Sequence, residues 1–159
     1  MRAVADDKAF DDAIMVLCEA CEAKNPICGS DLATTRSCPR CKAAIAPLAA
    51  QLDVDAHDLV AVVTSARVPV LIDFWAPWCP PCRLAGPIVK KVAADMAGKA
   101  LVLKVDTDRQ PELAAEFEVS AIPTFVVIRD RKIVSRHAGL ARPGTMKRWL
   151  STELTVEEK

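Results

Sequence analysis

The sequence predicts an α/β fold with a central mixed β-sheet flanked by helices, preceded by a small module of different composition. From about residue 47 onward, short runs of Val, Leu, Ile and Phe alternate with segments whose apolar residues recur every three or four positions. Residues 18–41 instead hold five of the seven cysteines and too few large apolar residues for a core of their own. We therefore divide the chain into an N-terminal extension (residues 1–17), a cysteine-rich module (residues 18–46) and an α/β domain (residues 47–159).

The sequence of the N-terminal extension predicts at most one short element of secondary structure. Residues 6–17 fit a helix, because Phe10, Ile14 and Leu17 would lie on one side of it. An acidic extension without regular structure fits the same residues equally well. Both interpretations stay open at this point.

The α/β domain is predicted to alternate strands with helices and to end with a hairpin and a helix. A continuous apolar run that stops at Ala-Pro predicts a buried strand, and an Arg-Asp-Arg-Lys sequence between two later strands predicts the hairpin turn. An additional strand before Asp53 is compatible with this order. Strands are predicted at residues 68–75, 100–105, 124–128 and 133–137, and helices at residues 54–63, 83–97, 110–117 and from 143 onward.

The helix predicted at residues 83–97 follows directly on a cysteine pair. Leu84, Ile88, Val92 and Met96 recur at intervals of four and predict one buried stripe along this helix. Because a proline removes one backbone hydrogen bond, Pro87 is expected to bend it.

Charge and hydropathy exclude several classes of protein. The chain has 21 basic and 21 acidic residues, without a dense Lys/Arg run, so we expect no binding to nucleic acid or to a membrane surface. No stretch approaches the roughly 18–20 apolar residues that span a bilayer. Aspartates occupy the N-terminal region where a signal peptide would be basic, which predicts a cytoplasmic protein. In that compartment, paired cysteines indicate metal binding or redox chemistry. A monomer is the default expectation.

Cys79 and Cys82 form a Cys-x-x-Cys pair where the buried strand passes into the helix. The first turn of a helix has unpaired N–H groups and the positive end of the dipole, and both stabilise a thiolate. We expect Cys79 to be exposed at the helix cap and to act as the nucleophile, with Cys82 one turn further on as the resolving thiol. Half of a zinc site and an inert pair are the alternatives.

Asp73 is the polar residue of an otherwise apolar strand. A carboxyl group in such surroundings has a raised pKa, so Asp73 could take and return the proton of Cys82. The alternative is an aspartate on a side of the strand that faces water.

The run at residues 70–83 resembles the active-site strand and loop of the thioredoxin family, and the resemblance extends over about 110 residues. Further motifs agree in order along the chain. They are Ala121-Ile122-Pro123-Thr124, similar to the family's cis-proline loop, Lys104, similar to its buried lysine, Pro87 in the active-site helix, and Ala138-Gly139 beside the substrate groove.

The resemblance implies a thioredoxin fold and a protein-disulfide reductase with Cys79, Cys82, Asp73 and Pro123 in the catalytic site. It also implies a client-binding surface formed by Trp78, Ile122 and Gly139 around Cys79. Clients would be disulfide-containing proteins, and a flavoprotein thioredoxin reductase using NADPH would supply electrons, so the chain itself would hold no flavin or nicotinamide. The sequence departs from the family's usual loop, because Pro80 replaces a glycine, and this puts recycling by an ordinary reductase in question.

Two further Cys-x-x-Cys pairs, Cys18/Cys21 and Cys38/Cys41, are separated by sixteen residues. Two such turns can bring together four sulfurs, which suits tetrahedral zinc and predicts a zinc-ribbon-like module. This arrangement resembles the thioredoxin-2 class, which has an N-terminal zinc-binding module. Cys28 could replace one ligand, join a disulfide or remain outside the site, and disulfides within the module are the alternative to zinc.

A competing hypothesis makes the chain a binding protein. Its cysteine-rich module would then dock a partner or act as a chaperone, with the α/β domain as a scaffold.

Overall fold

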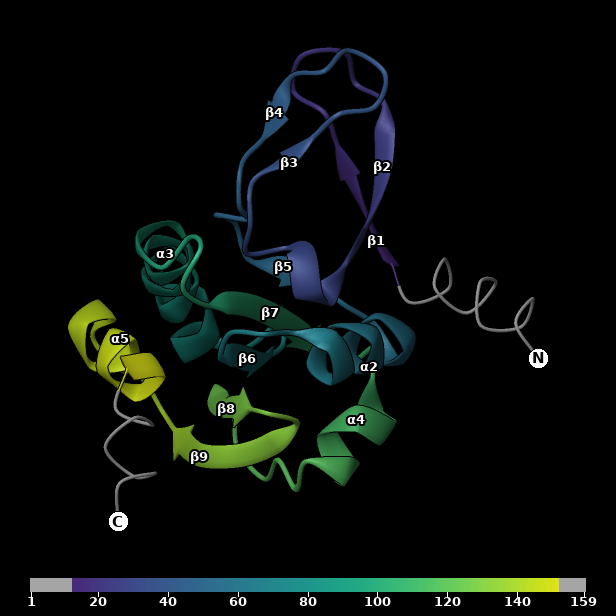
Figure 1. Ribbon diagram of the computed structural model, residues 1–159. Coiled ribbons are helices and arrows are strands. Elements are labelled where there is room, and N and C mark those ends of the chain that lie inside the picture. The colour runs from purple at the N-terminus through teal and green to yellow at the C-terminus, as the bar shows by residue number, and fades with distance from the viewer. Residues whose placement is uncertain (1–12, 152–159) are drawn as a thin grey trace.

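Five strands form the central sheet of the computed structural model, which describes residues 13–151 (Figure 1). Strand β6 pairs in parallel with β7 and antiparallel with β8, and β8 pairs antiparallel with β9, so the predicted mixed sheet is confirmed. The spatial order is β5-β7-β6-β8-β9. These strands are β5 (Leu52–Asp53), β6 (Val70–Trp75), β7 (Leu101–Asp106), β8 (Thr124–Arg129) and β9 (Lys132–Ala138).

Helices cover both faces of this sheet, with α3 and α5 on one side and α2 and α4 on the other (Figure 1). Successive residues of β6 pack on opposite faces of the sheet, because successive side chains of a strand point to opposite sides. Ile72 belongs to the core under α2 and α4, whereas Leu71 belongs to the core under α3 and α5. The helices are α2 (Ala56–Ser65), α3 (Pro80–Asp95), α4 (Pro111–Glu116) and α5 (Pro143–Ser151). None of the described helices combines the length and apolar character required to cross a membrane.

The predicted buried stripe of α3 is confirmed for Val92 and Met96, which are buried, and for Ile88, which packs against the same core, but it is wrong for Leu84. Leu84 is 65% exposed, and the residues that face the core are Cys82, Ala85, Val89, Val92 and Ala93. The helix continues through Pro87 as predicted. The buried side of the helix begins one residue further along than the predicted stripe, so Leu84 faces outward while Ala85 is buried.

The cysteine-rich module includes residues 13–17 of the N-terminal extension, and with them it is built from two short hairpins and a 3-10 turn (Figure 1). Strand β1 (Ala13–Leu17) pairs with β2 (Lys24–Cys28), β3 (Arg36–Ser37) pairs with β4 (Ala44–Ile45), and η1 (Gly29–Asp31) follows β2. Both alternatives for residues 6–17, a helix and an extension without regular structure, are therefore wrong for the last five residues, which form β1. Residues 6–12 lie outside the described range. Burial alternates between neighbouring residues here, as is typical of a strand: Ile14 is buried and Met15 is 63% exposed.

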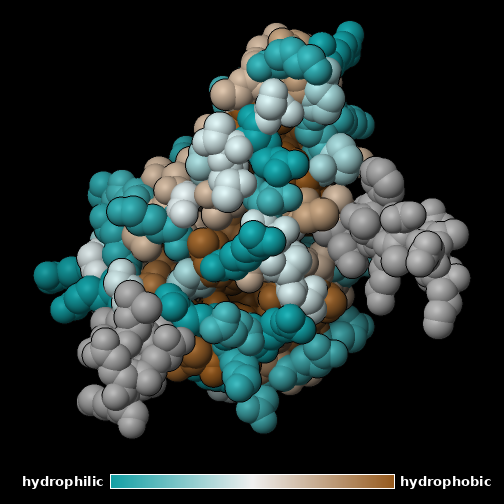
Figure 2. Space-filling model, in the orientation of Figure 1, coloured by the Kyte–Doolittle hydropathy of each residue, from teal (hydrophilic) through white to brown (hydrophobic). Residues whose placement is uncertain are grey.

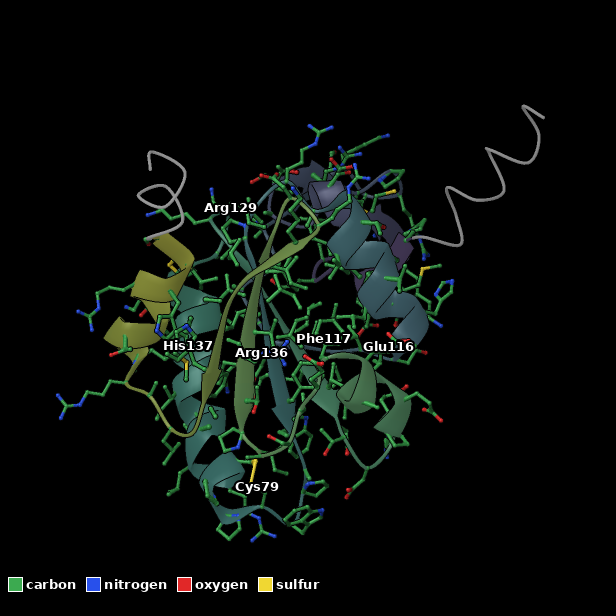
Figure 3. All side chains as sticks on the ribbon, turned by 90° about the horizontal axis from the view of Figure 1, so that it is seen from below. Cys79, Glu116, Phe117, Arg129, Arg136 and His137 are labelled. Atoms are coloured by element: carbon green, nitrogen blue, oxygen red, sulfur yellow. A yellow bond between two sulfur atoms is a disulfide. The ribbon has the colours of Figure 1, made fainter. Side chains whose placement is uncertain are left out.

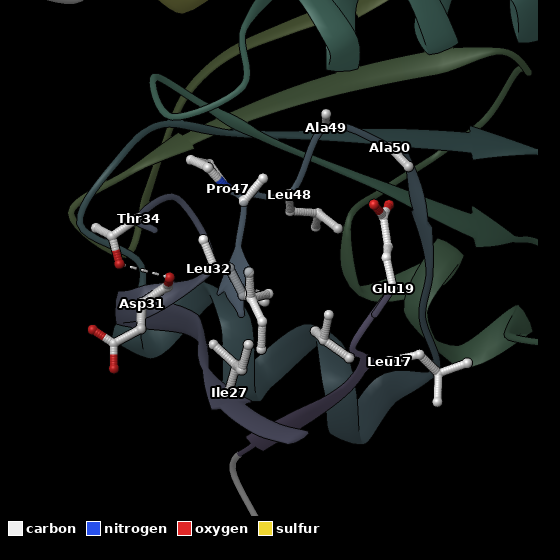
Figure 4. Close-up of a pocket in the computed structure, with 14 residues that line it drawn as sticks. Leu17, Glu19, Ile27, Asp31, Leu32, Thr34, Pro47, Leu48, Ala49 and Ala50 are labelled. Atoms are coloured by element: carbon white, nitrogen blue, oxygen red, sulfur yellow. Dashed lines mark hydrogen bonds between the residues drawn. The ribbon is translucent and has the colours of Figure 1, made fainter. Parts of the chain in front are cut away.

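The module packs directly on α2 of the larger domain. Gly29 of η1 lies so close to the helix that a Cβ atom there would come within 2.9 Å of Val62 Cα. Ile14 and Ile27 of the module belong to the same apolar core as Leu59 of α2. A cavity of about 350 Å³ lies between the module and the linker at residues 46–50 (Figure 4). Figure 2 shows hydrophobic side chains in the recessed middle of the molecule, between the module and the larger domain. The module and the sheet domain thus share one core.

Candidate active site and metal centre

Cys79 occupies the N-cap of α3, immediately after the turn that follows β6 (Figure 3). Its Sγ atom accepts a hydrogen bond from the backbone N–H of Cys82 at 3.3 Å, and the two cysteines form a disulfide. Pro80 and Pro81 fill the first two helical positions and have no N–H to donate. The N–H of Cys82 is thus the first helical donor available, and it points at Cys79. This local geometry favours negative charge on Cys79 rather than on Cys82.

Both sulfurs are covered in this disulfide form. Cys79 is 3% exposed and Cys82 4%, so the expectation that Cys79 would be exposed at the cap is wrong here. Ala76 lies in the same small apolar cluster, and Trp75 and Ile122 pack against it. Exposure therefore does not distinguish the two cysteines, whereas the position of each sulfur relative to the helix end does.

The loop before β8 lies against the disulfide. The carbonyl oxygen of Ile122 is 3.8 Å from Cys79 Sγ, and the Ile122–Pro123 peptide bond is cis. Pro123 is buried, and its carbonyl accepts a hydrogen bond from the N–H of Gly139 at 2.8 Å. Gly139 has a φ of 91°, a conformation that other residues rarely adopt, and it is exposed. The structure therefore brings Ile122, Pro123 and Gly139 together beside Cys79.

Large apolar side chains are exposed near these residues in the chain. Trp78 is 63% exposed and donates its indole N–H to Asp108 at 3.2 Å. Leu84 on α3 and Leu140, next to Gly139, are 65% and 48% exposed. The sequence interpretation missed Leu84, which it placed in the core, and Asp108, which carries no motif. An exposed leucine can only be identified once the buried side of the helix is known.

Asp73 lies on the face of the sheet that α3 covers, because it stands two residues after Leu71 in β6 and therefore points to the same side. It is 1% exposed, and its Oδ1 atom has no hydrogen-bond partner among the described residues. Burial raises the pKa of this carboxyl to about 7, while the charge of Lys104 lowers it and the charge of Asp53 raises it. The raised pKa expected from the sequence is thus present, and the cause is burial away from water.

Replacing Asp73 with asparagine is expected to stabilise the folded protein at alkaline pH. The folded-state pKa of about 7 exceeds the ordinary value of 3.8, so folding favours the protonated carboxyl. The contribution of Asp73 to stability is therefore fully present below about pH 4 and is lost as the pH rises through about 7. We expect Asp73→Asn to raise the free energy of unfolding by on the order of 4 kcal/mol above about pH 8, with little change near pH 4. Urea unfolding of both proteins across this range measures the effect, and a pH-independent difference would contradict it.

The four cysteines of the paired motifs converge at the tips of the two hairpins of the module. Their sulfur atoms all lie within 4.8 Å of one another, with Cys18 Sγ 3.6 Å from Cys41 Sγ and Cys21 Sγ 3.8 Å from Cys38 Sγ. Cys28 is not part of this group, which answers the question of whether it replaces one of the four. Four clustered thiols can hold a metal ion.

The two turns that carry these cysteines have the same backbone pattern. In the first, Glu22 N–H bonds to Cys18 O at 2.8 Å, and in the second Lys42 N–H bonds to Cys38 O at 2.8 Å. Glu22 and Lys42 both have positive φ, 61° and 68°. A hydrogen bond from the backbone of Cys41 is the largest of the effects that lower the pKa of Cys38 to about 6. The second turn thus favours the thiolate at Cys38, the form that binds metal.

Comparison with known proteins agrees with this architecture. The sequence profile of the family described as Thioredoxin matches residues 53–152. Thioredoxin C-3 of Corynebacterium nephridii is 31% identical over 145 residues, which cover 91% of this chain and 99% of that protein. Thioredoxin 1 of Nostoc sp. is 38% identical over 92 residues, or 58% of this chain and 86% of that protein.

A solved structure gives the same result for the fold. A mutant thioredoxin from Halobacterium salinarum NRC-1 superimposes with a TM-score of 0.61 and 30% sequence identity, covering 65% of this chain and 90% of that one. The chain therefore belongs to the thioredoxin family of thiol–disulfide oxidoreductases and, with its four clustered cysteines, resembles the thioredoxin-2 class.

Proposed function

We propose that this protein reduces disulfides of client proteins through the Cys79/Cys82 dithiol. The thiolate of Cys79 attacks one client sulfur, the S–S bond of the client breaks, and the other client sulfur leaves as a thiolate. Cys82 then loses its proton and attacks Cys79 Sγ, which releases the second client thiolate and leaves the Cys79–Cys82 disulfide. Two electrons pass to the client. The observation that carries this assignment is the helix-cap position of Cys79, whose sulfur receives the first available N–H of α3.

Asp73 is proposed as the proton acceptor for Cys82. The resolving step requires a base beneath the first turn of α3, and Asp73 lies on the face of the sheet that this helix covers. With a pKa of about 7, Asp73 can both accept and return a proton near neutral pH.

The client is proposed to bind to a surface that Trp78, Ile122, Pro123 and Gly139 form around Cys79. An exposed indole and backbone groups of a loop suit an extended, largely apolar segment of a polypeptide. We further propose that the protein works as a cytoplasmic monomer and is recharged by a thioredoxin reductase that uses NADPH, so that no flavin or nicotinamide is bound to this chain.

The module is proposed to hold one structural zinc ion through Cys18, Cys21, Cys38 and Cys41. Zinc bonded to four sulfurs at about 2.3 Å keeps neighbouring sulfurs about 3.8 Å apart. The distances of 3.6 Å and 3.8 Å between paired sulfurs match this value, and the donor set has the soft thiolates that zinc prefers. When bound, zinc would connect the two hairpins. It has no step in the thiol–disulfide reaction.

Capture of clients by a Cys82→Ser variant tests the proposed reaction. Without the resolving thiol, the mixed disulfide at Cys79 cannot be broken from within, so covalent adducts with insulin or with cellular proteins should accumulate. Non-reducing gels should show adducts that dithiothreitol releases. The same gels with a Cys79→Ser, Cys82→Ser double variant provide the matched control, which should show none.

The wild-type protein should also accelerate insulin reduction by dithiothreitol. A comparison with thioredoxin reductase plus NADPH as donor shows whether the Pro80 loop is recycled by that enzyme. Absence of both adducts and insulin reduction would contradict the reductase assignment and support a binding protein built on a thioredoxin scaffold.

A further inference from the structure

Three charged residues lie in one row across the sheet. In the parallel register, Lys104 of β7 stands opposite Asp73 of β6 on one side and opposite Asp53 of β5 on the other. Paired residues of neighbouring strands have side chains on the same face. One ammonium group therefore stands between two carboxyl groups, and among the described residues neither carboxylate lies within ion-pair distance of it.

Burial changes along this row. Asp73 is buried, Lys104 is half-buried and Asp53 is exposed. Asp53 and Lys104, together with Trp75, line a cavity of about 450 Å³ on the β5 side of the active-site strand. The Lys104 Nζ atom lies 4.1 Å from the centre of the Trp75 ring, a distance at which the ring face attracts a cation. The Trp75 ring is thus a third group, besides the two carboxyl groups, that attracts the ammonium group.

We propose that Asp53 is a positioning residue of the dithiol site, which acts on Asp73 by competing for the Lys104 ammonium group across the sheet. This inference rests on the proposed role of Asp73 as proton acceptor. If Lys104 were paired with Asp73 alone, the buried carboxyl would be held ionised and could not return a proton to the thiol. Asp53 attracts the Lys104 ammonium group and so weakens its interaction with Asp73. The carboxyl of Asp73 can therefore still exchange its proton.

Other charged groups face the same cavity and have to be considered. Asp55 caps α2 through the N–H of Asp58, and Asp106 lies 4.0 Å from Arg109 as an ion pair. These groups already have partners outside the row. Asp53 differs from them because it is directly opposite Lys104 in the register, and its charge is one of the causes that raise the pKa of Asp73.

The test is the titration of Asp73 by carboxyl NMR in the oxidised protein, where the Cys79–Cys82 disulfide removes both thiols from the titration. Asp53→Asn is expected to lower the pKa of Asp73 by roughly 0.5 unit, because it removes a competing negative charge. Asp53→Glu should restore the wild-type value. Asp58→Asn is the matched control, since this residue lines the same cavity from α2, outside the row, and should leave the pKa unchanged.

A double variant separates competition for Lys104 from direct repulsion between the two acids. If Asp53 acts through Lys104, the shift caused by Asp53→Asn becomes smaller when Lys104 is replaced with methionine. An unchanged pKa in Asp53→Asn, an equal shift in Asp58→Asn, or an undiminished shift without Lys104 would each overturn the proposal. The titration needs no turnover, so failure of the reductase assay in the wild type would reject the proposed function while leaving the Asp53 effect measurable.

Discussion

Insulin reduction is expected to fall at least about 1,000-fold when Cys79 is replaced with serine, because a hydroxyl group at this position cannot act as the attacking thiolate. The serine Oγ would still accept the N–H of Cys82, so the cap of α3 and the fold should be preserved. The loss of reductase activity would therefore be due to the missing thiolate and not to unfolding. Initial rates with dithiothreitol as electron donor measure it.

The control for this variant is another cysteine of the same chain. Cys28 lies outside both the disulfide and the four-cysteine cluster, so Cys28→Ser should retain the wild-type rate. Circular dichroism and thermal unfolding should show that Cys79→Ser remains folded. Comparable rates in Cys79→Ser and wild type would contradict the assignment of Cys79 as nucleophile and would point to Cys82 or to the module as the reactive thiol.

The sequence was most informative where a local pattern has a single structural solution. Strand β6 followed from a run of large apolar residues, and Asp73 stood out because it is the one carboxyl group within that run. The position of Cys79 at the cap of α3 followed from the change of pattern between strand and helix. In each case the deciding interactions lie within a few residues, so no knowledge of distant contacts was required.

Features that depend on distant contacts were missed. The exposure of Leu84 depends on which side of α3 meets the sheet, and the coverage of Cys79 depends on Ile122, 43 residues away in the chain. Strand β1 was missed, with a helix and an irregular extension both left open, because a five-residue element has too little periodicity to identify it. The row formed by Asp53 and Lys104 required the register between two strands that are separated by more than forty residues.

Loss of zinc is expected to unfold the cysteine-rich module, and Cys38→Ser is the variant that tests it. Strands β3 and β4 have two residues each, and such short hairpins are not stable without further support. The proposed zinc ion would therefore supply much of the stability of the module, because apparent binding free energies of about 10–16 kcal/mol are typical of structural zinc in small modules. Purified wild type should contain one zinc per chain by mass spectrometry, and Cys38→Ser should contain much less.

The consequence should extend beyond the module, because Ile14 and Ile27 share their apolar core with Leu59 of α2, and Gly29 lies against the same helix. Unfolding of the module would expose this surface of α2. Amide hydrogen exchange should therefore become faster in β1, β2 and α2 of Cys38→Ser, while α5, which packs on the opposite face of the sheet, should keep its protection. Cys28→Ser should retain zinc and exchange like the wild type. Full zinc content in Cys38→Ser would contradict the four-sulfur site, whereas loss of zinc without faster exchange would show that the hairpins are held by their contacts with α2 rather than by the metal.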